Sequence, residues 1–347
     1  MSSITLFGAG SWGTALAVHL AAAGRDVTLW ARRAEAVERM RSTGTNPTYL
    51  PDVPIPSSVR VTSNLDLAAE ASSLWALVTP SQHLRSVAEV LRPHLRDDVT
   101  LVSLAKGIEN ESLLTMTQVL RAVVGRGRHD LGVLHGPSHA EEVAAGRPTT
   151  VVAAAEDVAV ADRIRAAFMT EDLRVYLNTD MIGVEIGGAA KNVMAIAAGI
   201  SDGVGCGDNA KAAIITRGIA EIRRLGLAMG AQARTFSGLG GIGDLVVTCM
   251  SAHSRNRSLG QQIGAGQSLD EVLDGMEMVA EGVRTTESIR DLARRHELEM
   301  PITEAVHSIL FEGADPRDMI GHLMTRSPKR EHWLPDDLEN AGPGDQY

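Results

Sequence analysis

The sequence predicts an α/β domain with a doubly wound, parallel sheet, followed by an all-α domain. Short apolar runs alternate with helical patterns through the first half of the 347 residues, as in parallel strands that are joined by helices. From about residue 186 onward these runs stop, and amphipathic helical patterns follow one another. The chain is also longer than one hydrophobic core usually supports. Two domains are therefore expected.

The strands expected in the first domain are short apolar runs that end at turn residues. They are Ile4–Phe7, Val27–Trp30, Leu74–Val78, Thr100–Leu104, Leu131–Leu134, Thr149–Ala153 and, as a further candidate, Arg174–Leu177. Helical patterns lie between several of them, for example Thr14–Ala23 and Leu84–Leu91. Because strands alternating with helices favour a parallel sheet covered on both faces, we place this domain at residues 1–185.

The second half contains helices with apolar residues at helical spacing. They are Gly187–Gly199, Ala210–Met229, Leu269–Leu273, Thr285–Arg295, Thr303–Glu312 and Pro316–Leu323. Pro301 and Pro316 are typical of the first turn of a helix. We place the all-α domain at residues 186–326 and expect the polar remainder, 327–347, to be a disordered tail.

Composition narrows the classes of partner. The formal net charge of −10 argues against nucleic acid or an anionic membrane surface as a general partner. Cys206 and Cys249 lie far apart and have no metal-type spacing, so neither a disulfide framework nor a metal site is expected. The N-terminal apolar run has no basic residues before it and is soon interrupted by glycine, so no signal peptide and no membrane insertion are predicted. A cytoplasmic protein is expected.

A glycine-rich turn follows the first predicted strand. Gly8-Ala9-Gly10-Ser11-Trp12-Gly13 matches GxGxxG, and it stands between a strand and a helix, as in dinucleotide-binding Rossmann-type domains. In such a turn Gly8 permits the tight bend, Gly10 lets the backbone approach a pyrophosphate, and Gly13 lets helix and strand pack closely. A plain glycine-rich turn is the alternative. The context favours a nicotinamide cofactor.

Two arginines follow the second predicted strand. NAD-binding versions of the motif place an acid about 20 residues past the glycines, where it binds the ribose 2′-hydroxyl. This chain has Arg32 and Arg33 there, and guanidinium groups bind a 2′-phosphate well. The alternative is that both arginines are solvated and Glu35 binds the ribose. We predict that NADP(H) is preferred and that NAD(H) can also be used.

Three later strand ends carry polar loops. In a doubly wound sheet ligands bind beyond the carboxyl ends of the strands, so these loops should meet at one edge. A lysine there, Lys106, could polarise a carbonyl or hold a phosphate, although most lysines are surface residues. We interpret His135 and His139 as ordinary hydrogen-bonding residues. The three loops are Thr79–Gln82, Ala105–Gly107 and His135–Ala140.

The helical half supplies a second set of candidates. Lys191 lies among small residues, where burial would lower its pKa toward neutrality. Asp244 follows a run of glycines that suggests backbone close to a ligand, or else a flexible loop. Ser254-Arg255-Asn256-Arg257 suits a phosphate, or else is a solvated helix start. Val279–Gly282 is a candidate loop over the cofactor.

These motifs resemble those of the bacterial NAD(P)-dependent sn-glycerol-3-phosphate dehydrogenases. The matching stretches run in that family's order from about residue 4 to residue 325. They are GAGSWGTALA, NPTYLPDVPIP, SLAKGIE, GPSHAEEVAAGRPT, IGVEIGGAAKNVMAIAAGISDGVGCGDNAKAAIITRG, GLGGIGDLVVTC, SRNR, VAEGVRTTE and EMPITEAV. The resemblance implies a homodimeric enzyme that reduces dihydroxyacetone phosphate to sn-glycerol 3-phosphate for glycerophospholipid synthesis.

The resemblance also implies roles for individual residues. NADP(H) would be held, besides the three motif glycines, by Ser11, Trp12, Arg32, Arg33 and Lys106, with Ala140, Arg255, Val279 and Glu281 closing on it. The substrate would be held by Lys106, Gly136, Ser138, Lys191, Asp244, Ser254, Arg255 and Asn256. Lys191 would accept the proton in oxidation and donate it in reduction, with Lys106 as a second catalytic cation beside the developing alkoxide.

Departures from the family pattern are few. His139 stands where the family usually has Phe, His135 where a small residue is common, and Cys206 where an apolar residue is usually bulkier. Two alternatives keep the fold: a ketopantoate or hydroxy-acid reductase, and a non-catalytic NADPH sensor. The SRNR segment and Asp244 argue against the first, and the two lysines with Asp244 argue against the second.

Overall fold

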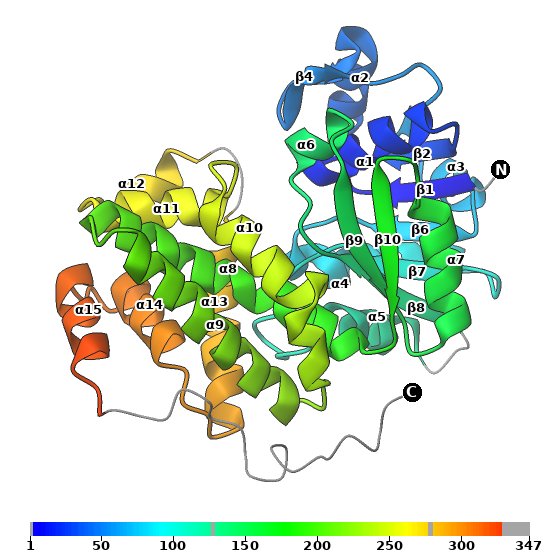
Figure 1. The fold of residues 1–347 in the computed structure, drawn as a ribbon. Helices are drawn as coiled ribbons and strands as arrows, with labels where there is room; N and C mark the ends of the chain where they lie inside the picture. The colour runs from blue at the N-terminus through cyan, green and yellow to red at the C-terminus, as the bar shows by residue number, and fades with distance from the viewer. Residues whose placement is uncertain (1–2, 126–128, 277–279, 328–347) are drawn as a thin grey trace.

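The structure is a computed structural model that describes residues 3–125, 129–276 and 280–327. Figure 1 shows the strands and the first helices on one side of the molecule and the later helices on the other. The predicted fold class is confirmed: a Rossmann-type sheet flanked by helices precedes a helical half. Apart from Ser327, the predicted tail lies outside the described residues.

One sheet of eight strands organises the first half, in the order β10-β9-β8-β7-β6-β1-β2-β5. The strands are β1 (Ser3–Phe7), β2 (Asp26–Trp30), β5 (Arg60–Thr62), β6 (Leu74–Leu77), β7 (Thr100–Ser103), β8 (Asp130–His135), β9 (Thr149–Ala154) and β10 (Leu173–Asn178). All seven predicted strands are present. The edge strand β5 was missed because three residues are too few to show a pattern.

The expectation of an all-parallel sheet is wrong at one pair. β8 and β9 are antiparallel, with Leu134 opposite Ala153, whereas β9 and β10 are parallel to each other. The connection from β8 to β9 holds only the short helix α6 (Ala140–Ala144). A helix of five residues spans ~8 Å, too little to carry the chain back along a six-residue strand of ~20 Å. The chain therefore turns back at the edge where β8 ends.

Helices cover both faces of this sheet, as predicted. They are α1 (Ser11–Ala22), α2 (Ala34–Thr43), α3 (Leu65–Glu70), α4 (Leu84–Leu91), α5 (Met116–Val124), α6 and α7 (Val158–Phe168), and a small hairpin joins β3 (Thr45–Asn46) to β4 (Leu50–Pro54). Helix α1 begins three residues before the predicted start, at Ser11. Aromatic packing anchors the sheet, since Phe7 lies 5.2 Å from Trp75 and 5.9 Å from Trp30 between ring centroids.

The second half is helical throughout the part that the structure describes. Its helices are α8 (Met181–Val204), α9 (Asp208–Ala228), α10 (Asp244–Met250), α11 (Arg255–Gly264), α12 (Leu269–Asp274), α13 (Glu281–Arg295), α14 (Pro301–Phe311) and α15 (Pro316–Met324). Both predicted prolines stand in the first helical turn. The division we placed after residue 185 falls inside α8, which runs across it without a break, so that boundary stays a prediction.

Helix α8 is the core of the helical half. At Gly199 and Gly203 of α8, and at Gly260 and Gly264 of α11, an added Cβ would lie 2.0–2.3 Å from a backbone oxygen of the facing helix. The two helices therefore pack backbone to backbone, as only glycine permits. By length and composition α8 could cross a membrane, but 94% of its most apolar window is buried inside the protein. Its small residues pack within this chain.

Candidate active site

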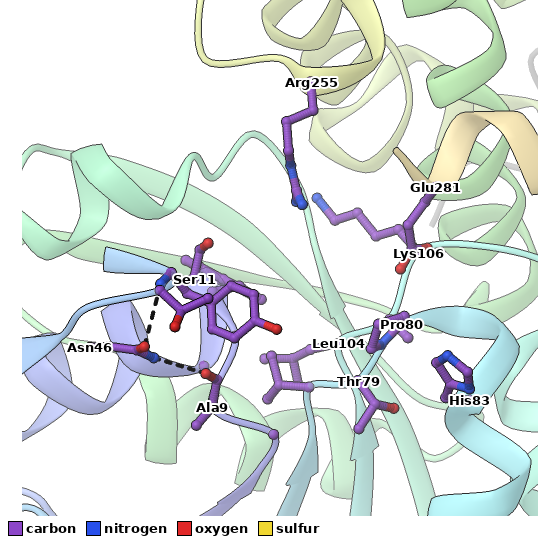
Figure 2. Close-up of a pocket in the computed structure, with 18 of the residues that line it drawn as sticks. Ala9, Ser11, Asn46, Thr79, Pro80, His83, Leu104, Lys106, Arg255 and Glu281 are labelled. Carbon is purple, nitrogen blue, oxygen red and sulfur yellow. Dashed lines mark hydrogen bonds between the residues drawn. The ribbon is translucent and has the colours of Figure 1, made fainter. Parts of the chain in front are cut away.

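A cleft of about 630 Å³ opens between the two halves of the molecule. The turn after β1, the ends of β2, β6 and β7, the loop after β8, and residues of α8, α10, α11 and α13 line it. Thr79, Lys106 and Ser138 represent the three strand-end loops, which meet here as predicted. Figure 2 shows Lys106 and Arg255 pointing toward a common space above the turn that carries Ser11.

The glycine-rich turn has the shape that the motif predicts. Gly8 has a φ of +130°, and a Cβ on it would lie 2.2 Å from the carbonyl oxygen of Val78. A Cβ on Gly13 would lie 1.9 Å from the carbonyl oxygen of Gly8, so both glycines are required for packing. A Cβ on Gly10 would meet nothing within 4 Å, which leaves that backbone open. Helix α1 begins at Ser11, so its N-terminus lies at the cleft, where the start of a helix can bind an anion.

A residue to which we assigned no role, Asn46, shapes this turn. Its Nδ2 donates to the carbonyl oxygen of Ala9 at 2.9 Å (Figure 2) and also to Oγ1 of Thr14 at 2.8 Å. Asn46 is 4% exposed, so these bonds are shielded from water. It comes from the NPTYLPDVPIP stretch, which carried the resemblance but no chemistry of its own. The hairpin β3–β4 is thereby tied to the nucleotide turn.

The arginines after β2 line the cleft. Both Arg32 and Arg33 are lining residues, and Arg33 is the residue directly before α2. Glu35, the alternative ribose ligand, is exposed and is not among the lining residues. Among the lining residues that the structure describes, the carboxylates are Asp244 and Glu281, which come from α10 and α13. This end of the cleft is therefore cationic.

Asp244 joins the two candidate lysines. Its Oδ2 accepts a hydrogen bond from Nζ of Lys106 at 2.8 Å, and its Oδ1 accepts one from Nζ of Lys191. Lys106 also donates to the carbonyl oxygen of Gly136 at 2.9 Å. Lys191 also donates to Oγ1 of Thr248 at 2.9 Å. The structure thus brings together residues that are up to 138 positions apart in the sequence.

Burial and the neighbouring charges change the proton affinities of Asp244 and Lys191. Asp244 is 0% and Lys191 6% exposed. Burial lowers the pKa of Lys191 to about 7; the charge of Asp244 opposes this change, and the charge of Lys106 adds to it. Burial alone would raise the pKa of Asp244, but the charges of Lys106 and Lys191 outweigh it and hold that pKa below its usual value. Lys191 is thus suited to exchange a proton near neutral pH.

The glycine run before Asp244 acts differently from our expectation. A Cβ on Gly241 would lie 2.3 Å from the carbonyl oxygen of Phe236, and a Cβ on Gly187 would lie 2.3 Å from that of Gly240. The glycines therefore let the backbone of the turn Leu239–Gly243 pack closely against helix α8, and they do not bring it to the cleft. Gly187 lies one turn before Lys191, so this packing sets Asp244 opposite that lysine.

The Ser254–Arg257 segment divides between the cleft and an anchor. Ser254, 4% exposed, caps α11 by accepting a hydrogen bond from the backbone N–H of Arg257 at 3.3 Å. Asn256, 8% exposed, accepts one at Oδ1 from the N–H of Gly282 at 3.0 Å, which leaves its NH2 group as the available donor. Ser254, Arg255 and Asn256 line the cleft, so the segment is not merely a solvated helix start.

Arg257 turns away from the cleft. Its Nη2 lies 2.7 Å from Oδ2 of Asp202, and Nζ of Lys211 lies 2.7 Å from Oδ1 of the same carboxylate. Asp202 comes from the end of α8 and Lys211 from the first turn of α9. One carboxylate therefore holds the start of α11 against both helices, close to Arg255 and Asn256.

Glu281 closes the cleft from the helical half. It is the first residue of α13, and its Oε1 accepts a hydrogen bond from the N–H of Ser81 at 3.2 Å, across to the sheet half. Its Oε2 is buried and has no hydrogen-bond partner among the described residues. Val279 lies outside the described residues. Ala140 begins α6 and, with Gly136, is not among the lining residues; Gly136 contributes its carbonyl oxygen to Lys106 instead.

His135 is an ordinary structural residue, whereas His139 lies at the cleft. His135 is buried, with Nδ1 3.2 Å from the carbonyl oxygen of Val184 and Nε2 3.1 Å from that of Ala105. Burial, with the charge of Lys106, lowers its pKa to about 4. The ring fits because α8 has Gly188 there, where a Cβ would lie 2.7 Å from Nδ1. His139 lines the cleft beside His253, with ring centroids 5.7 Å apart.

Among the described residues no group of three or more His, Cys, Asp or Glu side chains could hold a metal ion. The cations of this cleft are supplied by lysine and arginine.

Comparison with known proteins gives this cleft a family. The sequence profile of the NAD-dependent glycerol-3-phosphate dehydrogenase N-terminus matches residues 3–161, and that of the C-terminus of the same family matches residues 180–321. This chain belongs to the NAD-dependent glycerol-3-phosphate dehydrogenase family. The two profiles divide the chain much as the sheet and the helices do.

Relatives of this dehydrogenase family match nearly end to end. The chain is 69% identical over 341 residues to "Glycerol-3-phosphate dehydrogenase [NAD(P)+] 2" of Salinibacter ruber, covering 98% of this chain and 99% of the relative. A crystal structure of glycerol-3-phosphate dehydrogenase from Coxiella burnetii superposes with a TM-score of 0.90 at 38% identity, covering 94% and 99% of the two chains. A ketopantoate reductase from Ralstonia eutropha has a TM-score of 0.58 at 16% identity, covering 92% and 99%, which shows a shared fold alone.

Proposed function

We propose that this protein catalyses the reversible, NAD(P)-dependent reduction of dihydroxyacetone phosphate to sn-glycerol 3-phosphate. The observation that carries the proposal is the Lys106–Asp244–Lys191 array, which faces the same cleft as the glycine-rich turn. Family membership and the names of the relatives support this substrate and cofactor over a hydroxy-acid or ketopantoate substrate.

The cleft fits a dinucleotide. The open backbone at Gly10 and the helix start at Ser11 suit a pyrophosphate, while Arg32 and Arg33 suit a 2′-phosphate. When bound, the nicotinamide group supplies the hydride that reduces the C2 carbonyl. NADPH is the preferred form in this proposal because the lining residues near α2 are basic, and NADH remains usable.

Lys191 is proposed as the proton donor to the C2 oxygen in reduction and as the acceptor in oxidation. Its lowered pKa means that both protonation states are accessible near neutral pH. Asp244 holds the ammonium group in place, and Lys106 adds a second positive charge where the alkoxide develops. This pairing explains why a carboxylate lies buried between two cations instead of being replaced by an apolar residue.

The phosphate of the substrate is proposed to bind at the start of α11. Arg255 offers a charged fork, Asn256 an NH2 group whose orientation is set by Gly282, and Ser254 a hydroxyl. Binding the phosphate here would hold the reacting end of the substrate near Lys191, so that reaction becomes effectively unimolecular. Gly136 and Ser138 would complete the substrate site from the sheet half.

A direct assay tests the proposal. Purified protein should oxidise NADPH when dihydroxyacetone phosphate is added, and Lys191→Ala should abolish turnover without changing the thermal unfolding temperature greatly. Ketopantoate and 2-keto acids serve as comparison substrates. Activity only with those, or with no substrate at all, would reject the assignment and favour a related reductase or an NADPH-binding sensor.

We also propose that the enzyme is a cytoplasmic homodimer that serves glycerophospholipid synthesis. The thiols of Cys206 and Cys249 are both free, as suits a reducing compartment. Val158, Tyr176 and Leu177 are 57%, 47% and 36% exposed and line one hollow, which offers an apolar surface to a second copy. Light scattering on the purified protein tests the dimer, and cell fractionation tests the compartment.

A further inference from the structure

We propose that Arg39 is a third arginine of the cofactor's 2′-phosphate site and sets part of the preference for NADPH over NADH. The inference rests on the proposed nucleotide site and names a residue to which neither the motif nor the resemblance assigned a role. It concerns the cationic end of the cleft, where β2 ends and α2 begins.

The register of α2 brings Arg39 to the cleft. Ala36, Arg39 and Met40 line it together with Arg32 and Arg33, and positions three and four apart share one face of a helix. Met40 is 3% exposed, as is Val37, so the packing of α2 on the sheet half fixes which face it presents. Arg39 thus lies on the face of α2 that lines the cleft next to Arg32 and Arg33.

The acidic residues of α2 lie elsewhere on the helix. Glu35 and Glu38 are exposed and are absent from the cleft lining in the described structure. The face of α2 in the cleft is therefore basic although the helix carries both signs of charge. A hydroxyl group gains little from such a wall, whereas a phosphate gains charge-assisted, bidentate hydrogen bonds.

The charge of the ligand explains why a third arginine matters. A phosphate monoester carries about two negative charges at neutral pH, which two guanidinium groups at an exposed site only partly satisfy. The ribose hydroxyl of NADH offers no charge for Arg39 to bind. The effect of Arg39 should therefore appear with NADPH and be absent with NADH.

A different use of Arg39 makes the opposite prediction. A guanidinium group can also stack on the adenine ring, which the two cofactors share. In that case removing Arg39 would weaken NADPH and NADH equally. The cofactor ratio, and not the affinity for NADPH alone, is thus the decisive measurement.

The experiment compares Arg39→Gln and Arg39→Lys with the parent protein. Arg39→Gln should raise the Kd and KM for NADPH about tenfold and leave those for NADH within about twofold. Arg39→Lys should fall between, because lysine keeps the charge and loses the fork. Binding of 2′,5′-ADP should weaken in parallel, and binding of 5′-AMP should not change.

Arg41→Gln is the matched control. Arg41 lies two positions after Arg39 on α2, so its replacement by Gln removes the same charge from the same helix. Its Nη2 donates to the carbonyl oxygen of Val61 at 2.7 Å, and the residue does not line the cleft. It should leave the NADPH to NADH ratio unchanged. Equal effects on both cofactors, or an Arg41→Gln effect as large as that of Arg39→Gln, would overturn the proposal.

Failure of this inference can be told from failure of the proposed reaction. Calorimetric binding of NADPH, NADH, 2′,5′-ADP and 5′-AMP needs no substrate and no turnover. If dihydroxyacetone phosphate were not reduced, the reaction would be wrong while the binding comparison still judged Arg39. If turnover were normal and the cofactor ratio did not move in Arg39→Gln, only the role of Arg39 would be wrong.

Discussion

Lys106 reaches from the sheet half to Asp244 in the helical half, with 2.8 Å between Nζ and Oδ2. The other oxygen of that carboxylate binds Lys191. The two candidate catalytic lysines are therefore held in one geometry by a shared carboxylate, and the array needs both halves because Lys106 comes from one and Asp244 and Lys191 from the other. Whatever displaces the halves also separates the cations, so assembly of the cleft and its chemistry are linked.

Replacing Asp244 tests this link. In Asp244→Asn the two ammonium groups lose their shared negative charge, and mutual repulsion should displace them. We expect kcat to fall about a hundredfold and the Kd for NADPH to change far less, because the nucleotide turn and the arginines after β2 are untouched and only Lys106 is shared with the cofactor site. Steady-state kinetics and calorimetry give both values. A kcat within a few-fold of the parent would mean that Asp244 has no part in placing the lysines.

The lowered pKa of Lys191 predicts that the rates of reduction and of oxidation depend on pH in opposite ways. Reduction needs the protonated amine, so kcat/KM for dihydroxyacetone phosphate should fall as the pH rises through about 7. Oxidation of glycerol 3-phosphate needs the neutral amine and should rise over the same range. Because a bound phosphate favours the charged amine, the limb in kcat should lie at higher pH than that in kcat/KM.

Initial rates in both directions across this range check the expectation. Lys191→Arg serves as the control. Because arginine stays protonated, this variant should lose both the activity and the pH dependence near pH 7. A limb of the same position in a Lys191 variant that retains activity would assign the titration to another group.

Asp202 should affect substrate binding indirectly, through its ion pair with Arg257 at the start of α11. Asp202→Asn releases Arg257 and Lys211, so the first turn of α11 loses its anchor beside Arg255 and Asn256. We expect the KM for dihydroxyacetone phosphate to rise about tenfold, with smaller changes in kcat and in the KM for NADPH. Asp98→Asn, which removes an exposed ion pair with Arg96, is the control and should change nothing. A uniform loss of activity would indicate general destabilisation instead.

Glu185 should make stability depend on pH. This residue of α8 accepts hydrogen bonds from the N–H and Oγ1 of Thr117, both at 2.7 Å, and burial raises its pKa from 4.5 to about 7 despite them. Because its pKa is higher when folded than when unfolded, its contribution to stability is greatest below about pH 4.5 and is lost as the pH rises toward 7.

In Glu185→Gln the ionisation is removed while both hydrogen bonds can be kept. We expect the variant to gain stability relative to the parent as the pH rises, by up to ~3 kcal/mol above neutrality. Urea unfolding at about pH 5 and about pH 8 measures this difference. A difference that does not change with pH would show that Glu185 titrates alike in the folded and unfolded chain.

Much of the fold was predictable because buried parallel strands are continuous apolar runs. Ile4–Phe7 and Leu74–Val78 are examples, and each coincides with a strand at the centre of the sheet. The direction of β9 was not predictable, because an apolar run reads the same in either direction. Only the short connection through α6 excludes a crossover, and five helical residues make no strong pattern in a sequence.

The candidate site shows the same division. Lys106, Lys191 and Asp244 stood out as residue types in context, and Arg32 and Arg33 stood out by position after a strand. Asn46 and Asp202 did not, because a polar residue in a loop or at a helix end has many uses. Their contacts join segments 37 and 55 residues apart, a distance that no local pattern records.

Local periodicity and side-chain chemistry in the sequence were enough to predict the class of fold, the nucleotide turn and the two lysines that we propose as catalytic cations. The tertiary structure alone decided that one buried carboxylate serves both lysines, that the glycines before Asp244 pack on α8, that Arg257 anchors a helix, and that Arg39 lines the cleft. The physical reason is that burial and charge pairing depend on which segments meet, and that is settled only when the two halves pack together.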